Sequence, residues 1–391
     1  MASPSKYAET GVDVSKKGIE AFKATVKNLF PNAFCVVTQD PDFPEYGLVT
    51  HQDSNGSKPI MNYLLWKETG DISYLEPMAQ DVIAMNLDDI ICVGAKPISF
   101  TDYVAINGFT MNPKTDVLAA LNRGFGKVLG TLEKYGVNMP FGGGETADLP
   151  YQVRTIDVSG TAVGRVKLSN AITGSEISPG NLIVGLYSGG QTAYEDTHNS
   201  GIMCNGITLA RQVLTPPMYA EKYPEIVEPR GKAYEGRFDI LDLDEELGMR
   251  VGEAVISPTR LFAPAVARVL EDYGHHVSGM VHNTGGGQTK CLRLGKNVHY
   301  VKHDVLEVDP IFYLIQREGK VPWEEMFQDY NMGVGFELIV NDKDVVDDIL
   351  DIAEKLGLEG GMTGYVERSD GENKLTIHTD LSPAGKFHYK A

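Results

Sequence analysis

Six consecutive residues, Asp53-Ser54-Asn55-Gly56-Ser57-Lys58, combine an acid, a glycine, a hydroxyl and a lysine. A glycine in such a turn lets backbone N–H groups approach a phosphate, and a lysine adds a point charge. The segment could therefore hold a metal ion and a polyphosphate, although it lacks the GxxxxGK[ST] spacing of a Walker A loop. Taken alone, it is better explained as a surface turn without a ligand.

Three acids, Asp81, Asp88 and Asp89, lie on one face of a predicted helix. At about 100° per residue they fall within an arc of roughly 100°, opposite a run of aliphatic side chains. Because no lysine or arginine stands among them, the carboxylates would repel one another, and a bound Mg²⁺ ion would relieve that repulsion. A solvated helix face explains the pattern equally well. The helix runs into Gly94-Ala95-Lys96-Pro97, and a further acid, Asp102, follows a strand-like run.

Two glycine triplets adjoin residues that transfer protons or bind anions. The first, Gly142-Gly143-Gly144-Glu145-Thr146-Ala147, predicts close approach of the backbone to a ligand, or else a tight turn. The second, His282-Asn283-Thr284-Gly285-Gly286-Gly287, could combine proton transfer with anion binding, although a lone histidine is more often structural.

Two further segments resemble the starts of regular elements. Ser257-Pro258-Thr259-Arg260 predicts the start of a helix that ends near Gly274, and helix N-termini attract phosphates. Asn331-Met332-Gly333-Val334-Gly335 precedes a predicted strand. Each segment is also explained by an ordinary helix start or turn that binds no ligand.

Alternating strand and helix patterns must position these residues. Helical spacing of apolar residues follows Asn112-Pro113, and segments rich in β-branched residues at 154–166 and 181–187 predict strands. Later, 336–340 predicts a strand and 344–356 an amphipathic helix. Residues 172–180 contain two glycines and a proline, which indicates a turn between domains, and 216–248 is predicted to be an irregular insertion. The fold class is therefore α/β or α+β with two domains.

Composition limits the classes of function. The 391 residues are 42% hydrophobic, which predicts a sizeable core, and the formal net charge is −18. Such an acidic chain would repel nucleic-acid phosphates and anionic membranes. Four scattered cysteines form no CxxC pair and argue against a zinc site or a disulfide scaffold. With neither a signal peptide nor a membrane-spanning run visible, we expect a cytoplasmic protein.

Taken together and in order, these motifs resemble the AIR synthetase (phosphoribosylformylglycinamidine cyclo-ligase) family over nearly the whole chain. They begin with YAETGVDV at 7–14 and continue through the DxxGSK turn, the acidic helix with GAxP, and GGETA at 143–147. Cys204-Asn205-Gly206, SPTR at 257–260, HxTGGG and NMGxG follow. The acidic helix with GAxP belongs to a wider ATP-binding superfamily that includes thiamine-monophosphate kinase, selenophosphate synthetase and a hydrogenase maturation protein.

The resemblance implies ATP-dependent closure of the imidazole ring of aminoimidazole ribonucleotide from formylglycinamidine ribonucleotide, with release of ADP and phosphate. It implies a homodimer with a β-rich dimerisation domain at 1–168 and an α/β domain with a mixed sheet at 169–391. The cofactors would be ATP and Mg²⁺, with the metal on Asp53, Asp81 and Asp89. Catalytic candidates are His282, Asp89 and Lys58. ATP and phosphate would contact Asp53, Gly56, Lys58, Gly143, Gly144, Glu145 and Thr146. Substrate would contact Asn205, Gly206, Thr259, Arg260, Thr284, Gly285 and Gly286.

The chain departs from the family pattern at three places. Residues 31–48 replace a glycine-rich segment, and Gln288-Thr289-Lys290 replaces acidic and asparagine residues. Met203 stands where the family's HSNG motif has its histidine, and the insertion at 191–203 contains His198. We predict that this insertion folds over the substrate and that His198 takes the missing role; a solvent-exposed loop is the alternative. Another phosphotransferase of the superfamily, or a non-catalytic nucleotide-binding relative, remains the competing function.

Overall fold

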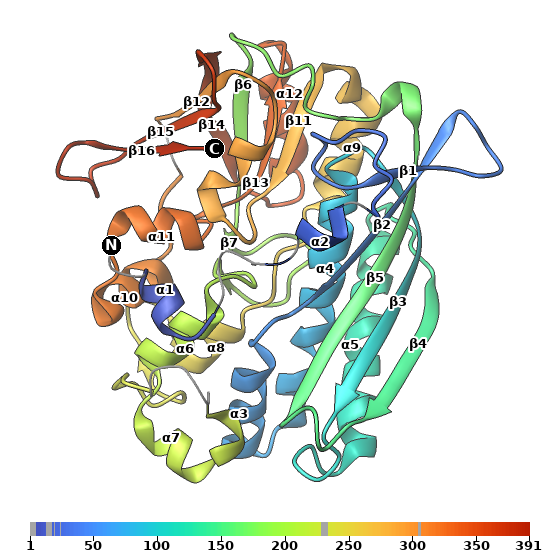
Figure 1. Ribbon diagram of the computed structural model, residues 1–391. Helices are drawn as coiled ribbons and strands as arrows, with labels where there is room; N and C mark the ends of the chain where they lie inside the picture. Colours follow the sequence, from blue (N-terminus) through green and yellow to red (C-terminus); the bar gives the residue numbers. More distant parts are fainter. Residues whose placement is uncertain (1–4, 13–17, 19, 24, 228–233, 304–305) are drawn as a thin grey trace.

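The computed structural model describes residues 5–12, 18, 20–23, 25–227, 234–303 and 306–391. Two large mixed sheets with helices packed against them form the molecule, which confirms the predicted fold class (Figure 1). The first sheet ends at Lys167 and the second begins at Leu182. The domain boundary at 168/169 stays a prediction that this change of sheet supports.

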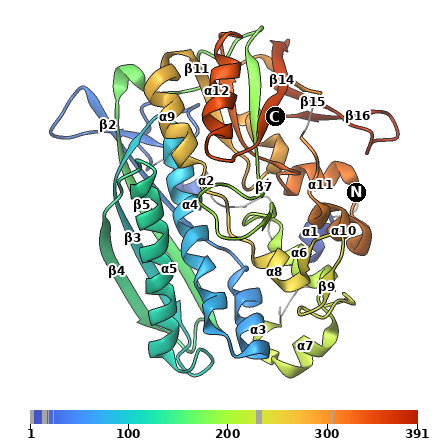
Figure 2. The ribbon, with the colours of Figure 1, turned by 180° about the vertical axis from the view of Figure 1, so that it is seen from behind.

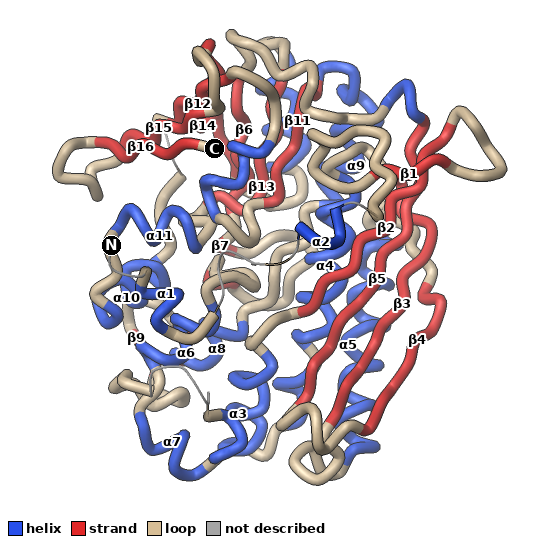
Figure 3. Tube along the Cα trace, viewed as in Figure 1, coloured by secondary structure: helices blue, strands red, loops and turns tan. Residues whose placement is uncertain are grey.

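The N-terminal sheet has the strand order β1-β2-β5-β3-β4. Only the β3–β4 pair is parallel. Two helices, α4 and α5, cover one face, and the described part of the chain places no helix on the other face (Figure 3). The strands are β1 Val37–Gln39, β2 Tyr46–Ser54, β3 Lys96–Ile106, β4 Phe141–Asp148 and β5 Ile156–Lys167.

The C-terminal sheet has the order β11-β13-β6-β14-β12-β15-β16, with β12–β15 as its parallel pair. Every residue of β13 is buried, as expected for a central strand covered on both faces. Its strands are β6 Leu182–Tyr187, β11 Val277–His282, β12 Val298–Lys302, β13 Val334–Val340, β14 Gly360–Arg368, β15 Lys374–His378 and β16 Lys386–Lys390. Short pairs are formed by β7 Gly189–Gly190 with β8 Asn199–Ser200, and by β9 Leu243–Asp244 with β10 Met249–Arg250.

Twelve α-helices are present among the described residues, and Figure 2 shows the face on which α5 and α9 lie exposed to view. The first, α1, packs with the C-terminal half, because Tyr7 N donates to Glu325 Oε1 at 2.9 Å. None of these helices has the length and apolar character that a membrane crossing requires. They are α1 Lys6–Glu9, α2 Glu20–Lys23, α3 Pro59–Thr69, α4 Pro77–Ile91, α5 Lys114–Lys134, α6 Ile207–Leu214, α7 Pro217–Lys222, α8 Val251–Ile256, α9 Ala263–Tyr273, α10 Pro310–Gly319, α11 Trp323–Asp329 and α12 Val345–Glu354.

Some of the helices, strands and turns predicted from the sequence are confirmed, and others are wrong. The strand at 336–340 and the helix at 344–356 are confirmed as β13 and α12. The helix expected from Ser257 is wrong at its start, since α9 begins at Ala263. The alternative of a tight turn at Gly142–Gly144 is also wrong, because these glycines lie inside β4. Insertion 216–248 carries α7 and the short strand β9; its residues 228–233, and residues 13 and 14 of the first motif, lie outside the described residues.

Candidate active site

Helix α4 holds Asp81, Asp88 and Asp89, and all three side chains are buried at 0%, 0% and 6% exposure. The solvated-face alternative is therefore wrong. A helix rises 1.5 Å per residue, so Asp81 and Asp89 lie about 12 Å apart along the axis. Asp81 and Asp89 thus belong to separate clusters rather than to one carboxylate group.

Asp81 is the partner of Lys58. The Lys58 ammonium is fully buried and donates to Asp81 Oδ1 and Met203 O at 2.9 Å, and also to Ser257 O. The same carboxylate oxygen accepts Thr259 N at 2.7 Å and Thr259 Oγ1 at 2.8 Å. Because an ammonium has three donors and all are used, Lys58 has no donor left for a polyphosphate, contrary to expectation. Thr259 is likewise committed to Asp81.

Asp88 stabilises the start of α9. Its two carboxylate oxygens accept Phe262 N at 3.0 Å and Ala263 N at 2.9 Å, donors that have no partner within the helix. Burial raises the pKa of Asp88 to about 8, and these two N–H bonds oppose the rise. The position of this carboxylate explains why α9 begins at Ala263 rather than at Ser257.

Asp89 faces three nitrogen-bearing side chains. Its Oδ1 lies 2.7 Å from His282 Nδ1, and its Oδ2 lies 3.3 Å from His51 Nε2 and 3.9 Å from Lys290 Nζ. Burial alone would raise the pKa of Asp89, but Lys290, His282 and His51 together hold it below the ordinary value. Asp89 is therefore ionised at neutral pH. Burial lowers the pKa of His282 despite the carboxylate.

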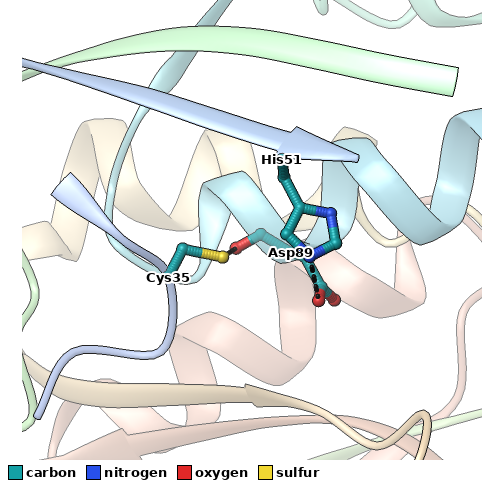
Figure 4. A group of neighbouring side chains, drawn as sticks. All are labelled: Cys35, His51 and Asp89. Carbon is teal, nitrogen blue, oxygen red and sulfur yellow. Dashed lines mark hydrogen bonds and ion pairs between the residues drawn. The ribbon is translucent and has the colours of Figure 1, made fainter. Parts of the chain in front are cut away.

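Two more residues complete the surroundings of Asp89. Figure 4 shows the Asp89 backbone oxygen beside the Cys35 sulfur and the Asp89 carboxylate beside the His51 ring. Cys35 Sγ donates to the backbone oxygen of Asp89 at 3.1 Å. His51 Nδ1 contacts Asn86 Oδ1 at 3.1 Å. The sequence did not single out Cys35, His51 or Asn86. A usable signal existed for His51, since it lies two residues before Asp53 on the same strand face.

The second glycine triplet forms the loop beside this cluster. Gly286 and Gly287 have φ of 100° and 48°, and a Cβ at Gly287 would lie 2.3 Å from Tyr330 O. Glycine is therefore required there. Lys290 Nζ donates to Thr284 Oγ1 at 2.5 Å, and the Cβ position of Gly285 lies 3.5 Å from Asn205 Oδ1.

The 53–58 turn meets the 204–208 segment next to that loop. Ser57 Oγ and Thr208 Oγ1 are 2.8 Å apart, and Cys204 Sγ lies 3.7 Å from Asn55 O. Gly206, with φ of 70°, begins α6. The structure thus brings Asp53, Gly56, Asn205, Gly206, Thr284, Gly285, Gly286, Asp89 and His282 into one region. Side-chain atoms of Asn55, Asn205 and His282 are buried there with no hydrogen-bond partner among the described residues, which suits a polar ligand.

Other expected site residues lie elsewhere. Gly143, Gly144, Glu145 and Thr146 are on the edge strand β4, separated from β2 by β5 and β3. Arg260 is 1% exposed and donates to Glu195 and to the carbonyls of Tyr187, Gly189 and Gly190, so it has a structural role within the chain. Its expected contact with substrate stays a prediction.

His198 lines a pocket of about 680 Å³ between α4, α5 and the segments 194–199 and 248–258. Neither Asp89 nor His282 belongs to its lining. Within insertion 191–203, Tyr194 donates to Leu261 O at 2.7 Å and Asp196 pairs with Lys127 at 2.6 Å. The insertion therefore folds against helices, on a different side of α4 from the Asp89 cluster.

A magnesium ion can be tested against these donors. Mg²⁺ prefers carboxylate oxygens and water. Asp53 fits, because it is partly exposed and only its Oδ1 is engaged, by Ser54 N. Asp81 is fully buried; its Oδ1 already accepts three hydrogen bonds, while its Oδ2 has no partner among the described residues. Asp89 is surrounded by nitrogen and sulfur donors. Of the three expected ligands, Asp53 suits Mg²⁺ best.

Comparison with known proteins gives the family. Residues 33–166 match the family described as AIR synthase related protein, N-terminal domain. The phosphoribosylformylglycinamidine cyclo-ligase of Methanocaldococcus jannaschii is 32% identical over 372 residues, covering 92% of this chain and 91% of the relative. That of Methanococcus maripaludis strain C5 is 32% identical over 385 residues, covering 94% and 95%.

Solved structures support the fold. AaThiL complexed with AMPPCP and TMP has a TM-score of 0.54 at 11% identity, covering 95% of each chain. T. maritima PurL complexed with AMPPCP has a TM-score of 0.52 at 15% identity, covering 98% of this chain but 49% of that one. At these identities the likeness concerns the fold alone.

Proposed function

This chain belongs to the phosphoribosylformylglycinamidine cyclo-ligase family, and on that premise we propose that it is a ligase of purine biosynthesis that makes aminoimidazole ribonucleotide with ATP. The observation that carries the proposal is the 32% identity to a cyclo-ligase over 92% of the chain. The formyl oxygen of formylglycinamidine ribonucleotide attacks the terminal phosphorus of ATP and ADP leaves. An amidine nitrogen then attacks the formyl carbon that carries the new phosphate group. Phosphate leaves, and the ring is closed.

The residues around Asp89 suit these two steps. Lys290 and the N–H groups of Gly285 and Gly286 supply positive charge for the transferred phosphate, whereas Thr284 N and Gly287 N donate to backbone oxygens. Asp89 holds the His282 ring through Nδ1, and His282 Nε2 is left for proton transfer. Asn205 and Gly285 lie next to each other, so one bound ribonucleotide would contact both residues. Holding the two reacting ends of one substrate together accounts for much of the acceleration.

Asp53 would hold Mg²⁺ at the end of β2. The ion would neutralise charge on the phosphates of ATP. Asp53 and Asp102 both stand opposite Gly160 in the sheet, so a second acid lies two strands from Asp53 along the same row. Burial raises the pKa of Asp102, and a metal ion bound beside this carboxylate would lower it.

We further propose a cytoplasmic homodimer. The face of the N-terminal sheet that α4 and α5 leave uncovered carries exposed apolar side chains, with Ile98 at 40% and Tyr103 at 36% exposure. Burying such a face against a second copy removes apolar surface from water. It would also give Glu145 and Thr146, on the edge strand, a route to the partner's site. Light scattering at micromolar concentration should report twice the 42.7 kDa chain mass, and a monomeric mass would refute this assembly.

The activity is tested directly. Purified protein with formylglycinamidine ribonucleotide, ATP and Mg²⁺ should release one ADP for each aminoimidazole ribonucleotide formed. ATP hydrolysis without ring closure, or turnover of thiamine monophosphate in place of this substrate, would overturn the assignment in favour of another phosphotransferase of the superfamily.

A further inference from the structure

We propose that Cys35, His51 and Asp89 form a binding site for a divalent transition-metal ion of the Zn²⁺ type, separate from the Mg²⁺ of the nucleotide. One ligand atom from each residue lies within 4.8 Å of the others. The three come from different parts of the fold: Cys35 precedes β1, His51 lies on β2 and Asp89 on α4 (Figure 4). Thiolate, imidazole and carboxylate are the groups that Zn²⁺ takes in proteins.

The spacing already approaches that of a tetrahedral centre. With Zn–N and Zn–O bonds of about 2.0 Å and Zn–S of about 2.3 Å, ligand atoms stand roughly 3.3–3.6 Å apart. His51 Nε2 and Asp89 Oδ2 are 3.3 Å apart. A small rotation of the Cys35 side chain away from the Asp89 backbone oxygen would complete three ligands. The His51 side chain is 24% exposed, so that water has access to a fourth position.

Hydrogen bonding fixes which atom of His51 faces the site. The Asn86 amide nitrogen donates to Val82 O at 2.8 Å and to Asp53 O at 3.2 Å, so Asn86 Oδ1 must accept. His51 Nδ1 therefore carries the proton that Asn86 Oδ1 accepts, and a neutral ring presents the lone pair of Nε2 to the Asp89 carboxylate. Two acceptors at 3.3 Å repel each other unless a cation stands between them. That cation is either a proton on His51 or a metal ion.

The donors decide the type of metal. Sulfur and imidazole ligands favour Zn²⁺, Co²⁺ and similar ions over Mg²⁺, which prefers oxygen. Asp89 Oδ1 is held by His282 Nδ1, and His51 by Asn86, so two of the three ligands have the supporting contact that orients metal ligands in proteins. Binding converts the Cys35 thiol into a thiolate and passes its proton to solvent. No electron transfer is involved.

Lys290 opposes the ion. Its ammonium lies 3.9 Å from Asp89 Oδ2 and 4.5 Å from the Phe34 ring. A metal ion on Asp89 would be repelled by this charge until the flexible side chain moves away. Replacing Lys290 with glutamine should therefore strengthen metal binding, whereas removing a ligand should weaken it. These opposite signs are specific to a metal at this place.

The test is a Co²⁺ titration of the chelator-treated full chain in excess Mg²⁺ and without ATP, so that it does not depend on ring closure. We expect one Co²⁺ per chain with a thiolate-to-metal charge-transfer band in the near ultraviolet. Cys35→Ser should lose the band, His51→Asn should weaken binding by about 100-fold, and Lys290→Gln should strengthen it. The matched control is Cys92→Ser, because Cys92 is also buried and bonds a backbone oxygen of the same helix, Asp88 O, but lies outside the cluster.

Two results would overturn the site. One is the absence of a charge-transfer band in wild-type protein that retains its thermal transition, which would leave a protonated His51 as the cation beside Asp89. The other is a band that persists in Cys35→Ser, which would place the metal on another cysteine. His51→Asn keeps the question answerable if Cys35→Ser does not fold.

Discussion

Replacing Lys58 with methionine separates a structural role from a phosphate-binding role. Methionine keeps most of the length of the side chain but leaves Asp81 as a fully buried, unpaired carboxylate. Removing one partner of a buried ion pair costs about 3–5 kcal/mol. A chain of 391 residues unfolds with an entropy of about 0.8 kcal/mol per K, so the melting temperature should fall by roughly 4–6 °C.

The assay is differential scanning calorimetry of Lys58→Met beside an exposed-pair control. Lys127→Met also removes a lysine from a short ion pair, with Asp196 at 2.6 Å, but both side chains are more than half exposed and the shift should stay below about 1 °C. The double variant Lys58→Met/Asp81→Asn should recover part of the loss, because the amide keeps an acceptor for Thr259. An unchanged melting temperature with a raised KM for ATP would refute this reasoning and support phosphate binding by Lys58.

Three further outcomes are expected. Asp89→Asn should lower turnover by about 10²-fold or more without unfolding, because it removes the charge that orders His282 and Lys290; near wild-type turnover at saturating Mg²⁺ would contradict this. His198→Ala should change kcat and KM by less than about twofold, since the pocket it lines excludes the Asp89 cluster; a larger change would restore its predicted role at the substrate. Burial raises the pKa of Asp309 from 3.8 to about 7, so the stabilisation from its protonated form is present below pH 4 and lost as pH rises through 7. Asp309→Asn should therefore raise the melting temperature, relative to wild type, more at pH 8 than at pH 5; equal shifts at both values would contradict the raised pKa.

The sequence predicted features that depend on local spacing. Apolar residues at helical intervals identified α12, and β-branched runs identified β13, because burial of one face imposes a period on the chain. The motif order identified the family, which the full-length relatives confirm. The repulsion among the three carboxylates of α4 also predicts that they need partners from elsewhere in the chain or a bound cation. Each of them has such partners in the structure.

The partners themselves could not be predicted. Lys58 bonds Met203 O and Ser257 O, which lie 145 and 199 residues further along the chain, and Asp89 bonds His282 at a separation of 193. No spacing within a helix specifies such contacts. Lys58 looked free for phosphate because its three acceptors are distant in sequence. The ATP contact expected for Gly143 comes from the family resemblance and stays a prediction; within one chain, β4 lies at the opposite edge of the sheet from β1.

The division of tasks along α4 explains why only one of its acids is available for chemistry. Asp81 and Asp88 bind the segment 259–263 that leads into α9, and Asp89 binds His282, so the acids fasten α4 to two segments of the C-terminal half. The first two are fully buried and have only backbone, hydroxyl and lysine partners from the protein. Asp89 alone lies beside partly exposed nitrogen donors, His51 and Lys290. Because Asp81 and Asp88 hold the two halves in place, the position of Asp89 relative to the 284–287 loop does not depend on a ligand. A carboxylate held in this way can orient a histidine or a cation before substrate arrives, which is the condition for electrostatic stabilisation without reorganisation.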